Sequence, residues 1–474
     1  MSSLPNFLKP NGEFSTGLVV DPELLRKHGG NGPRYTSYPT ADRFVEAFDA
    51  AAYRHWLQNR NVGGFAKPLS LYVHLPFCNT ICYYCACNKI ISRDHGRSAK
   101  YIDYLAREID MVAACLGEDR TVAQMHWGGG TPTFLSEEEM GQLMRAIRAR
   151  FDLDPDGEYA IEVDPRKVEN KRVTHLAKLG FNRISLGVQD FDREVQRAVN
   201  RVQSVAETQQ VIDAARGSGF KSVNIDLIYG LPKQGVAGFT RTLEQVIACD
   251  PDRIALYSYA HLPSVFKPQR RIAEADLPVA EIKLELLVTA IARLQAAGYV
   301  YIGMDHFAKP GDELAVAQRQ GRLRRDFQGY SAGGDSDTVG LGVSAIGKIG
   351  PVYVQNVKDI DDYYDLLEHG SLPVMRGIEL SADDIVRRAV IQALACHFTV
   401  SKESISIAYL IDFDRYFAAE LEDLRRLAAD GLVEIDCDWI NVTPRGRLLV
   451  RAVCMVFDRY LRVAGQRAQY SRVM

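Results

Sequence analysis

The sequence predicts an α/β protein: a partial (β/α)6 TIM-like barrel, preceded by an N-terminal arm and followed by a mostly helical C-terminal domain. Six short apolar runs alternate with helical stretches between about residues 68 and 260, which is typical of βαβ units with parallel strands. Right-handed crossovers repeated along six strands curl such a sheet toward a barrel. The last hundred or so residues change to helical apolar spacing, which predicts a separate domain.

Length and composition bound the organisation of the chain. With 474 residues, of which 47% are hydrophobic, it exceeds an ordinary single domain and can bury a large core. We expect an N-terminal arm and helix over residues 1–60, the barrel with an extension over 61–350, and the helical C-terminal domain over 351–474. The net charge is −3, whereas nucleic-acid-binding proteins usually carry a strong positive charge, so no nucleic-acid partner is expected.

The chain carries no pattern of export or membrane insertion. No apolar run reaches the ~18 residues of a transmembrane helix, and the N-terminus lacks the basic-then-apolar pattern of a signal peptide. Nine cysteines without such a signal favour thiol or metal chemistry over disulfides, because the cytoplasm keeps thiols reduced. We therefore expect a cytoplasmic protein.

The predicted elements follow in order along the chain. Gly32–Thr40 holds two prolines that disfavour a helix, so the arm is predicted to be extended and to lead into a helix near residues 42–58. Ser136 and Glu139 predict a capping box for the second barrel helix. The predicted strands are Leu69–Phe77, Val122–Gly128, Tyr159–Val163, Arg183–Val188, Ser222–Tyr229 and Arg253–Tyr259, and the predicted helices between them lie near residues 98–116, 136–151, 170–179, 206–217 and 238–249.

Beyond the barrel, the pattern predicts a long helix near residues 276–297 and then a seventh strand or extended segment, Tyr299–Phe307. The C-terminal domain is predicted to contain three helical stretches and a small hairpin. The helical stretches are Asp383–Ala395, Phe413–Ala429 and Arg445–Tyr460, and the hairpin joins Leu432–Ile435 to Trp439–Val442.

The strongest chemical signal is a cysteine array directly after the first predicted strand. Cys78, Cys82 and Cys85 have C-x3-C-x2-C spacing, and soft thiolates this close together favour a soft metal centre. Three thiolates on one loop can hold three corners of a [4Fe–4S] cluster and leave the fourth iron open. A zinc site is the alternative, but no second C-x2-C pair completes it. Cys87 follows at x1 spacing, which points its side chain the other way, so we expect it not to be a ligand.

Polar residues follow the predicted strands where each strand ends. Gly128–Thr133 follows the second strand, and its glycines leave bare backbone that can approach an amino-acid-like cofactor. Because the carboxyl ends of the strands of a βα barrel line one mouth, polar residues at six successive ends predict a binding site. Singly, each would be an ordinary surface or turn residue. The set comprises Glu162, Asp164, Gln189, Asp190, Arg201, Asp226 and Tyr259–His261.

Two further features lie outside this set. His74, which precedes the cysteine array, is predicted to brace the loop rather than to bind metal. A basic cluster is either a solvated helix face or an anion platform, since arginine pairs with carboxylates in a bidentate manner. The cluster consists of Arg319, Arg322, Arg324 and Arg325.

The cysteine array, followed by Gly128-Gly-Gly-Thr131, resembles the radical S-adenosylmethionine (SAM) superfamily. Further segments narrow this resemblance to the oxygen-independent coproporphyrinogen III oxidases of the HemN type. The similarity runs from about residue 30 to the C-terminus. It is carried by Pro33–Thr40, Tyr72–Cys78, Cys85–Cys87, His126–Thr133, Gly187–Phe191, Asp226–Pro232 and Gly303–Phe307.

Two alternatives stay open. The heme chaperone branch of the same family shares the cysteine loop and the glycines, and it would bind heme without turning over a porphyrinogen. It typically has Phe in place of Cys87 and lacks the Pro33–Pro39 segment, so both features favour the oxidases. Another radical SAM enzyme would cleave SAM but ignore coproporphyrinogen.

The resemblance implies an oxidoreductase of heme biosynthesis. Such an enzyme converts two propionates of coproporphyrinogen III to vinyl groups by oxidative decarboxylation, giving protoporphyrinogen IX, and uses a 5′-deoxyadenosyl radical. The resemblance also implies a [4Fe–4S] cluster, two molecules of SAM, a small-molecule substrate, an electron donor such as flavodoxin or ferredoxin, and a monomer. Because the cofactor carries the radical chemistry, no side chain is assigned as a catalytic group.

Matching the family residue by residue assigns the cofactor contacts. Cys78, Cys82 and Cys85 would ligate the cluster. The SAM molecule bound to iron would contact Tyr72, Gly129, Glu162 and Ile346. The second SAM molecule would contact Tyr84, Gly130, Thr131, Gln189, Arg201, Asp226 and Ala260.

Overall fold

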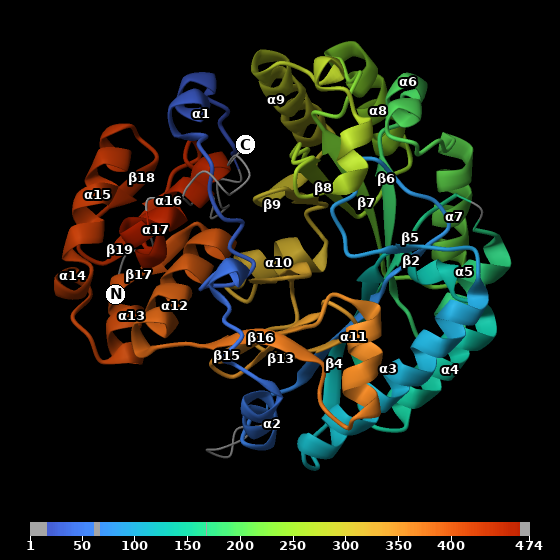
Figure 1. Ribbon diagram of the computed structural model, residues 1–474. Coiled ribbons are helices and arrows are strands. Elements are labelled where there is room, and N and C mark those ends of the chain that lie inside the picture. The colour runs from blue at the N-terminus through green and yellow to red at the C-terminus, as the bar shows by residue number, and fades with distance from the viewer. Residues whose placement is uncertain (1–16, 61–66, 167, 465–474) are drawn as a thin grey trace. The chain divides into compact units, whose positions relative to one another are not determined.

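The computed structural model describes residues 17–60, 67–166 and 168–464 (Figure 1). Its contacts divide the chain into two compact units, each assembled from segments far apart in the sequence. The first unit contains the residues up to Thr40, Ile291–Ala332 and the residues from Ala382 onward, and the second contains Ala41–Ala290 and Gly333–Ser381. The division into three consecutive domains stays a prediction.

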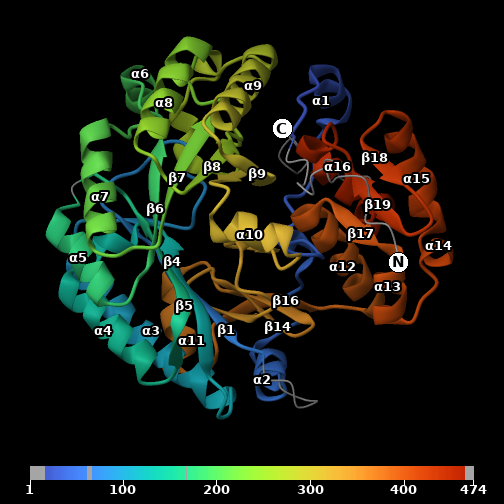
Figure 2. The ribbon, with the colours of Figure 1, turned by 180° about the vertical axis from the view of Figure 1, so that it is seen from behind.

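The second unit is built around the predicted parallel sheet. Six parallel strands lie side by side in chain order, which confirms the α/β partial barrel. They are β1 (Leu69–Leu75), β4 (Thr121–Gly129), β5 (Asp152–Val163), β6 (Arg183–Gln189), β7 (Ser222–Tyr229) and β8 (Arg253–Ser258). The intervening helices run along the outer side of these strands in both views (Figures 1 and 2). They are α3 (His95–Cys115), α4 (Glu137–Arg148), α5 (Asn170–Lys178), α6 (Arg193–Ala198), α7 (Val205–Gly217) and α8 (Val236–Ala248).

The burial pattern of β7 shows how the sequence selects the two faces of the sheet. Val223, Ile225 and Leu227 are at most 1% exposed. Asn224 and Asp226 alternate with them and are only partly buried. Since successive side chains of a strand point to opposite faces, one face carries apolar side chains and the other carries polar groups, where a site can form.

Four strands extend this sheet beyond β1, and the sequence analysis assigned none of them. β13 (Asp337–Leu341) pairs in parallel with β1, and β14 (Ile346–Ile349), β15 (Val352–Asn356) and β16 (Val374–Glu379) continue in antiparallel order. The backbones of β13 and β14 approach each other closely at Gly340. A Cβ at this position would lie 2.7 Å from the carbonyl carbon of Ile346, which leaves room only for glycine. Glycines weaken the hydrophobic pattern of β13, β14 and β16. β15 has no glycine, but all five of its residues are buried, so it lacks the alternation of a half-buried strand.

Several predicted elements differ from the structure. The helix near residues 42–58 is shorter, because Asp49 caps α2 (Ala50–Gln58) by accepting from the backbone N–H groups of Ala51 and Ala52. The predicted seventh strand is an antiparallel hairpin of β9 (Val300–Gly303) and β10 (His306–Ala308). Met304 adopts a positive φ of 51° at the turn between them. Non-glycine residues rarely adopt this conformation, so the sequence does not predict a turn here.

β5 begins at Asp152, seven residues before the predicted start, and the helical stretch predicted over Arg445–Tyr460 is divided into a 3-10 turn at Arg447–Leu449 and helices at Val450–Val456 and Arg459–Ala464. Two local features agree with the predictions. The capping box of Ser136 and Glu139 is present at the start of α4, and the C-terminal hairpin forms as predicted. The remaining elements of the second unit are β2 (Phe77–Cys78), β3 (Ile90–Ile91), α11 (Ile360–Glu368) and short 3-10 turns at Ala41–Arg43, Pro132–Phe134, Lys267–Arg271 and Glu274–Asp276. The helix α9 (Ala280–Ala296) runs from the second unit into the first.

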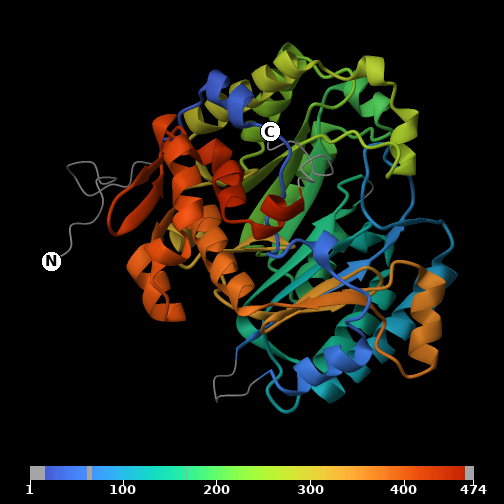
Figure 3. The ribbon, with the colours of Figure 1, turned by 60° about the vertical axis from the view of Figure 1, so that its left-hand side comes forward.

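The first unit combines the N-terminal arm with the helical C-terminal segment (Figure 3). The arm is extended after α1 (Pro22–His28), and it is fastened by buried side chains. Tyr35 donates its hydroxyl hydrogen to Asp458 Oδ2 at 3.0 Å, and Arg451 Nε donates to the carbonyl oxygen of Pro33 at 3.0 Å. The C-terminal elements are α12 (Ala382–His397), β17 (Thr399–Ser401), α13 (Lys402–Tyr409), α14 (Phe413–Tyr416), α15 (Ala418–Ala429), β18 (Val433–Ile435), β19 (Trp439–Val442), a 3-10 turn at Arg447–Leu449, α16 (Val450–Val456) and α17 (Arg459–Ala464).

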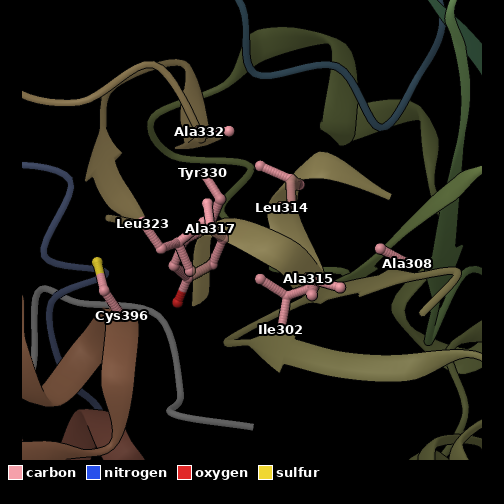
Figure 4. Close-up of a cluster of buried hydrophobic side chains, with 9 residues drawn as sticks. All are labelled: Ile302, Ala308, Leu314, Ala315, Ala317, Leu323, Tyr330, Ala332 and Cys396. Atoms are coloured by element: carbon pink, nitrogen blue, oxygen red, sulfur yellow. The ribbon is translucent and has the colours of Figure 1, made fainter. Parts of the chain in front are cut away.

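A small apolar core holds the middle segment of this unit together (Figure 4). The ring of Tyr330 lies among Leu314, Ala317 and Leu323, and Cys396 from α12 belongs to the same cluster. Tyr330 also donates its hydroxyl hydrogen to the carbonyl oxygen of Ala395 at 2.8 Å. These contacts join α10 (Glu313–Arg319) and the hairpin of β11 (Arg324–Asp326) and β12 (Gly329–Ser331) to the C-terminal helices.

None of the helices in the described part of the chain combines the length and apolar character that a bilayer crossing requires.

A buried carboxylate fastens the loop between β13 and β14. Glu108 on α3 is 1% exposed and accepts hydrogen bonds from the backbone N–H of Gly342 at 2.7 Å, from Asn356 Nδ2 at 2.6 Å and from the Tyr363 hydroxyl at 2.6 Å. The next residue of the loop, Val343, donates its N–H to the Tyr101 hydroxyl at 3.0 Å. These bonds satisfy the buried donors and hold the segment that leads to β14.

We expect Glu108→Ala to lower the free energy of unfolding by about 3 kcal/mol, because it leaves buried donors without an acceptor. Urea denaturation followed by circular dichroism measures this loss. Glu118→Ala, at an exposed position just beyond the same helix, is the matched control and should change little. Equal losses in the two variants would contradict the role given to Glu108.

Candidate active site

The cysteine loop is closed at its base by a short pair of strands. Phe77 and Cys78 of β2 pair with Ile90 and Ile91 of β3. The backbone N–H of Ile90 donates to the Pro76 carbonyl at 2.7 Å, and that of Ser92 to the Cys78 carbonyl at 3.0 Å. The pairing of β2 with β3 therefore holds the two ends of the cysteine loop next to each other, close to the end of β1.

The three thiols of the array gather on this loop in different environments. Cys82 is buried, Cys78 and Cys85 are half-buried, and all three are free cysteines. Cys78 interacts electrostatically with both of the others. In the described residues, only Asp436–Asp438 bring three potential metal-ligand side chains within 4.8 Å of one another. The loop thiols do not converge as ligands of a single zinc ion would, so their spacing suits a larger group.

The pKa values of the thiols diverge because their neighbours differ. The Cys87 thiol hydrogen-bonds to the Cys85 sulfur and, with the Lys89 ammonium, lowers the pKa of Cys85 to about 6 despite burial. Burial raises the pKa of Cys78 to about 11, although its sulfur lies 3.5 Å from Thr131 Oγ1. Cys85 is thus a thiolate at neutral pH, the form that binds metal. Cys87 supports Cys85, and the prediction that it is not itself a ligand stays a prediction.

The glycine run lets β4 approach the cysteine loop. A Cβ on Gly130 would lie 2.7 Å from the Phe77 carbonyl oxygen, and one on Gly129 would lie 2.6 Å from the His74 ring. The backbone N–H of Gly130 donates to the Leu75 carbonyl at 2.8 Å, and that of Thr131 donates to the Phe77 carbonyl at 2.8 Å. The glycines are therefore required by close packing, and these N–H groups are engaged within the chain.

A chain of polar rings links this packing to Glu162. His74 donates from Nε2 to the Asn88 carbonyl at 3.0 Å, which braces the cysteine loop as predicted, and its Nδ1 accepts from the Tyr72 hydroxyl at 3.1 Å. The Tyr72 ring stacks on His126 with centroids 6.0 Å apart, and His126 Nε2 lies 3.1 Å from Glu162 Oε1. Burial lowers the pKa of His74, so this ring is neutral.

Glu162 and Asp226 are partly buried acids with opposite pKa shifts. Burial disfavours the charged form of Glu162, but the hydrogen bonds with His126 and with the Gly129 N–H prevail and lower its pKa. Burial and the nearby charge of Glu162 raise the pKa of Asp226 to about 6, against hydrogen bonds from Asn224 and Ser185. The site therefore holds one firmly ionised carboxylate and a second that titrates near neutrality.

Gln189 closes β6 in a strained conformation. Its φ is 68°, which non-glycine residues rarely adopt, and its Oε1 is buried without a hydrogen-bond partner. Backbone strain of this kind clusters at functional sites. Gln189 therefore offers an acceptor for a ligand that carries N–H or O–H groups.

The other predicted cofactor residues are tied to the same region of the second unit. Gln269 donates from Nε2 to the carbonyl oxygens of Tyr84 at 3.1 Å and Ala260 at 3.2 Å, so it joins the cysteine loop to the end of β8. Ile346 packs its backbone against Gly340, whose strand pairs with β1 opposite Tyr72. Sequence reasoning missed Gln269, because a single glutamine in a polar turn carries no local signal.

Arg201 connects β6 to the cysteine loop. It is 8% exposed, its Nε donates to the Gly187 carbonyl at 3.1 Å, and its Nη1 lies 3.2 Å from Asp164 Oδ2 and 3.5 Å from Cys82 Sγ. The structure thus brings Asp164, which follows β5, and Arg201, which follows α6, together with Cys82. Arg166, which the sequence analysis did not select, joins the same group.

Comparison with known proteins identifies the family. The model of the radical SAM superfamily matches residues 72–246, and that of the HemN C-terminal domain matches residues 380–449. Over 96% of this chain and 98% of the relative, the sequence is 52% identical to oxygen-independent coproporphyrinogen III oxidase from Pseudomonas aeruginosa. The chain belongs to the oxygen-independent coproporphyrinogen III oxidase family. The Escherichia coli relative is 48% identical over 96% of this chain and 98% of its own length.

A solved structure agrees with this assignment. Coproporphyrinogen III oxidase (HemN) from Escherichia coli, described as a radical SAM enzyme, matches with a TM-score of 0.88 and 46% identity over 94% of this chain and all of that one. Membership in the radical SAM superfamily implies a [4Fe–4S] cluster and SAM. The loop fits such a group: it presents three free thiols, one of them ionised at neutral pH, beside a glycine run that brings β4 close.

We expect the metal-free protein to be alkylated at Cys85 well before Cys78 at pH 7, because thiolates are the nucleophiles and only Cys85 has a pKa of about 6. Iodoacetamide labelling at a series of pH values, read by peptide mass spectrometry, gives both rates. The Cys85 rate should level off above pH 6, and Cys87→Ala should move that midpoint upward. Equal rates for the two thiols at pH 7 would contradict the assigned environments.

Proposed function

We propose that this chain catalyses the oxygen-independent oxidative decarboxylation of two propionates of coproporphyrinogen III to vinyl groups, giving protoporphyrinogen IX in heme biosynthesis. The observation that carries this proposal is 52% identity to the Pseudomonas aeruginosa oxidase over 96% of the chain, a span that includes the cysteine loop. The product differs from the substrate by two molecules of CO2 and four hydrogens, so the reaction is an oxidation. Two hydrogen atoms pass to two 5′-deoxyadenosyl radicals, and the other two leave as two protons and two electrons, which go to an electron acceptor.

Cys78, Cys82 and Cys85 are the proposed ligands of the [4Fe–4S] cluster. When bound, the cluster and SAM supply a one-electron reduction that generates a carbon radical able to take hydrogen from a propionate side chain. The chain's own residues hold and shield this chemistry. Of the three proposed ligands, Cys82 is the one that is buried from water.

Two SAM molecules are part of the proposal. The lowered pKa of Glu162 keeps this carboxylate negatively charged in a partly buried setting, which suits an ammonium group, and Gln189 offers a buried acceptor oxygen. We assign the iron-bound SAM to Tyr72, Gly129, Glu162 and Ile346. We assign the second SAM to Tyr84, Gly130, Thr131, Gln189, Arg201, Asp226 and Ala260.

The cellular setting is also a proposal. We place the protein in the cytoplasm as a monomer that takes electrons from a flavodoxin or a ferredoxin. All nine cysteines are free thiols, which suits a reducing compartment. The negatively charged chain would meet such a donor through a local surface rather than through its net charge.

Arg325 is the candidate for binding a substrate carboxylate. Arg319 donates to the Pro310 carbonyl, Arg322 donates to Gln320 and the Ala332 carbonyl, and Arg34 pairs with Asp305 at 2.7 Å. Arg325 is 5% exposed and stacks on the Tyr330 ring at 4.8 Å, and its Nη1 is buried without a hydrogen-bond partner. A buried guanidinium with an open donor suits a carboxylate.

The proposed function is tested anaerobically. The protein is reconstituted with iron and sulfide, reduced, and given SAM and coproporphyrinogen III. Mass spectrometry should detect 5′-deoxyadenosine and the loss of two CO2 per porphyrinogen. Cys85→Ala should abolish both products, whereas Cys437→Ala, at an exposed thiol outside the loop, should retain them. Deoxyadenosine without decarboxylation would favour another substrate, and heme binding without either product would favour a chaperone.

We expect Arg325→Ala to raise KM for coproporphyrinogen III at least about tenfold, because a hydrogen bond to a charged group contributes about 1.5–3 kcal/mol. SAM binding should not change. Arg322→Ala is the matched control, since that side chain already bonds within the chain. A KM equal to that of the control would remove Arg325 from the substrate site.

A further inference from the structure

Two guanidinium groups face the sulfur of Cys82, the middle cysteine of the array. Arg201 Nη1 lies 3.5 Å from Cys82 Sγ, and Arg166 Nη2 lies 3.9 Å from it. Cys82 is 8% exposed, so water screens these contacts only weakly. A buried sulfur therefore experiences two positive charges and two N–H donors.

Asp164 holds both arginines in place and offsets part of their charge. Its Oδ2 accepts from Arg166 Nη2 at 2.6 Å and from Arg201 Nη1 at 3.2 Å. Arg166 also donates from Nε to Asp164 Oδ1 at 2.9 Å. Because this carboxylate accepts from both guanidinium groups, the pKa of Asp164 is lowered despite burial, and the group carries one net positive charge beside Cys82.

The other two thiols of the array have different neighbours. Cys78 Sγ faces the Thr131 hydroxyl at 3.5 Å, and Cys85 faces the Cys87 thiol and the Lys89 ammonium. Lys89 itself donates to the carbonyl oxygens of Cys85 and Cys87 at 3.3 and 3.2 Å. The paired guanidinium groups are thus specific to Cys82.

We infer that Arg166 and Arg201 raise the reduction potential of the [4Fe–4S] cluster through Cys82, and that Asp164 limits their effect. The inference rests on the proposed function only in taking Cys82 as a cluster ligand. Reduction adds one negative charge to the cluster and its thiolates. Nearby positive charge and N–H···S hydrogen bonds stabilise that charge, so they favour the reduced form.

Variants of Arg166 and Asp164 should shift the potential in opposite directions. Arg166→Gln removes one positive charge, and the ratio of reduced to oxidised cluster at a fixed potential should fall about tenfold, which is 59 mV for a one-electron couple. Asp164→Asn removes the negative charge at nearly constant shape, and the ratio should rise. Loosening of the loop alone would not reverse sign between the two variants.

The experiment is an anaerobic redox titration of the reconstituted protein without SAM or porphyrinogen. Dithionite is added with mediator dyes, the reduced cluster is followed by electron paramagnetic resonance, and iron content is measured for each variant. Arg150→Gln is the matched control, because it breaks a half-exposed ion pair with Asp110 at 2.6 Å. It should leave the potential unchanged.

Arg166→Lys keeps the inference testable if Arg166→Gln fails to hold iron. It retains the positive charge and should keep a potential close to that of the unmodified protein. Shifts of the same sign in Arg166→Gln and Asp164→Asn, or potentials equal to that of Arg150→Gln in both, would overturn the inference. If the protein decarboxylates coproporphyrinogen III but the variants show no such shifts, the inference about the potential is wrong and the proposed function stands. If the variants show the expected shifts but the protein does not decarboxylate coproporphyrinogen III, the proposed function is wrong and the inference stands.

Discussion

The close approach of two backbones at Gly130 is the constraint on which the rest of the site depends. A Cβ at this position would lie 2.7 Å from the Phe77 carbonyl oxygen, so only glycine lets the end of β4 rest against the chain that leaves β1. The hydrogen bonds from Gly130 to Leu75 and from Thr131 to Phe77 then fix the start of the cysteine loop. Backbone packing rather than ligand binding therefore determines where the cysteine loop starts.

Charges around this loop are arranged in opposed pairs. Glu162 stays ionised because His126 and a backbone N–H bond to it, and Asp164 stays ionised because two arginines do. Asp226 has neutral hydrogen-bond partners and a nearby negative charge, and its pKa rises to about 6. Three acids at the end of β5 and in β7 thus acquire different protonation behaviour from their partners, as expected where burial makes each unpaired charge costly.

Strong local patterns made the barrel predictable, and contacts distant in sequence made the rest unpredictable. Ser222–Tyr229 has the bounds that its alternation predicts, and the spacing of the thiols identified the loop. The four strands from Asp337 to Glu379 were not predicted. Three of them contain a glycine that weakens the hydrophobic pattern, and the fourth, β15, is buried along its whole length and shows no alternation. Gln269 and Arg166 were missed for a related reason. The contacts of each side chain depend on the fold, and the residues next to each in the sequence form no motif that would indicate those contacts.

The position of β1 has a consequence for how the protein is made. This strand is flanked by β4 on one side and by β13 on the other, where Val73 pairs with Leu341. During synthesis the second edge of β1 stays unpaired until residues 337–341 have left the ribosome. Until then, the nascent chain has an unpaired strand edge next to thiols that can be oxidised. Unpaired strand edges promote aggregation, so the chain is most prone to aggregate at this stage of synthesis. The second edge of β1 is therefore covered only after nearly three quarters of the chain has been translated.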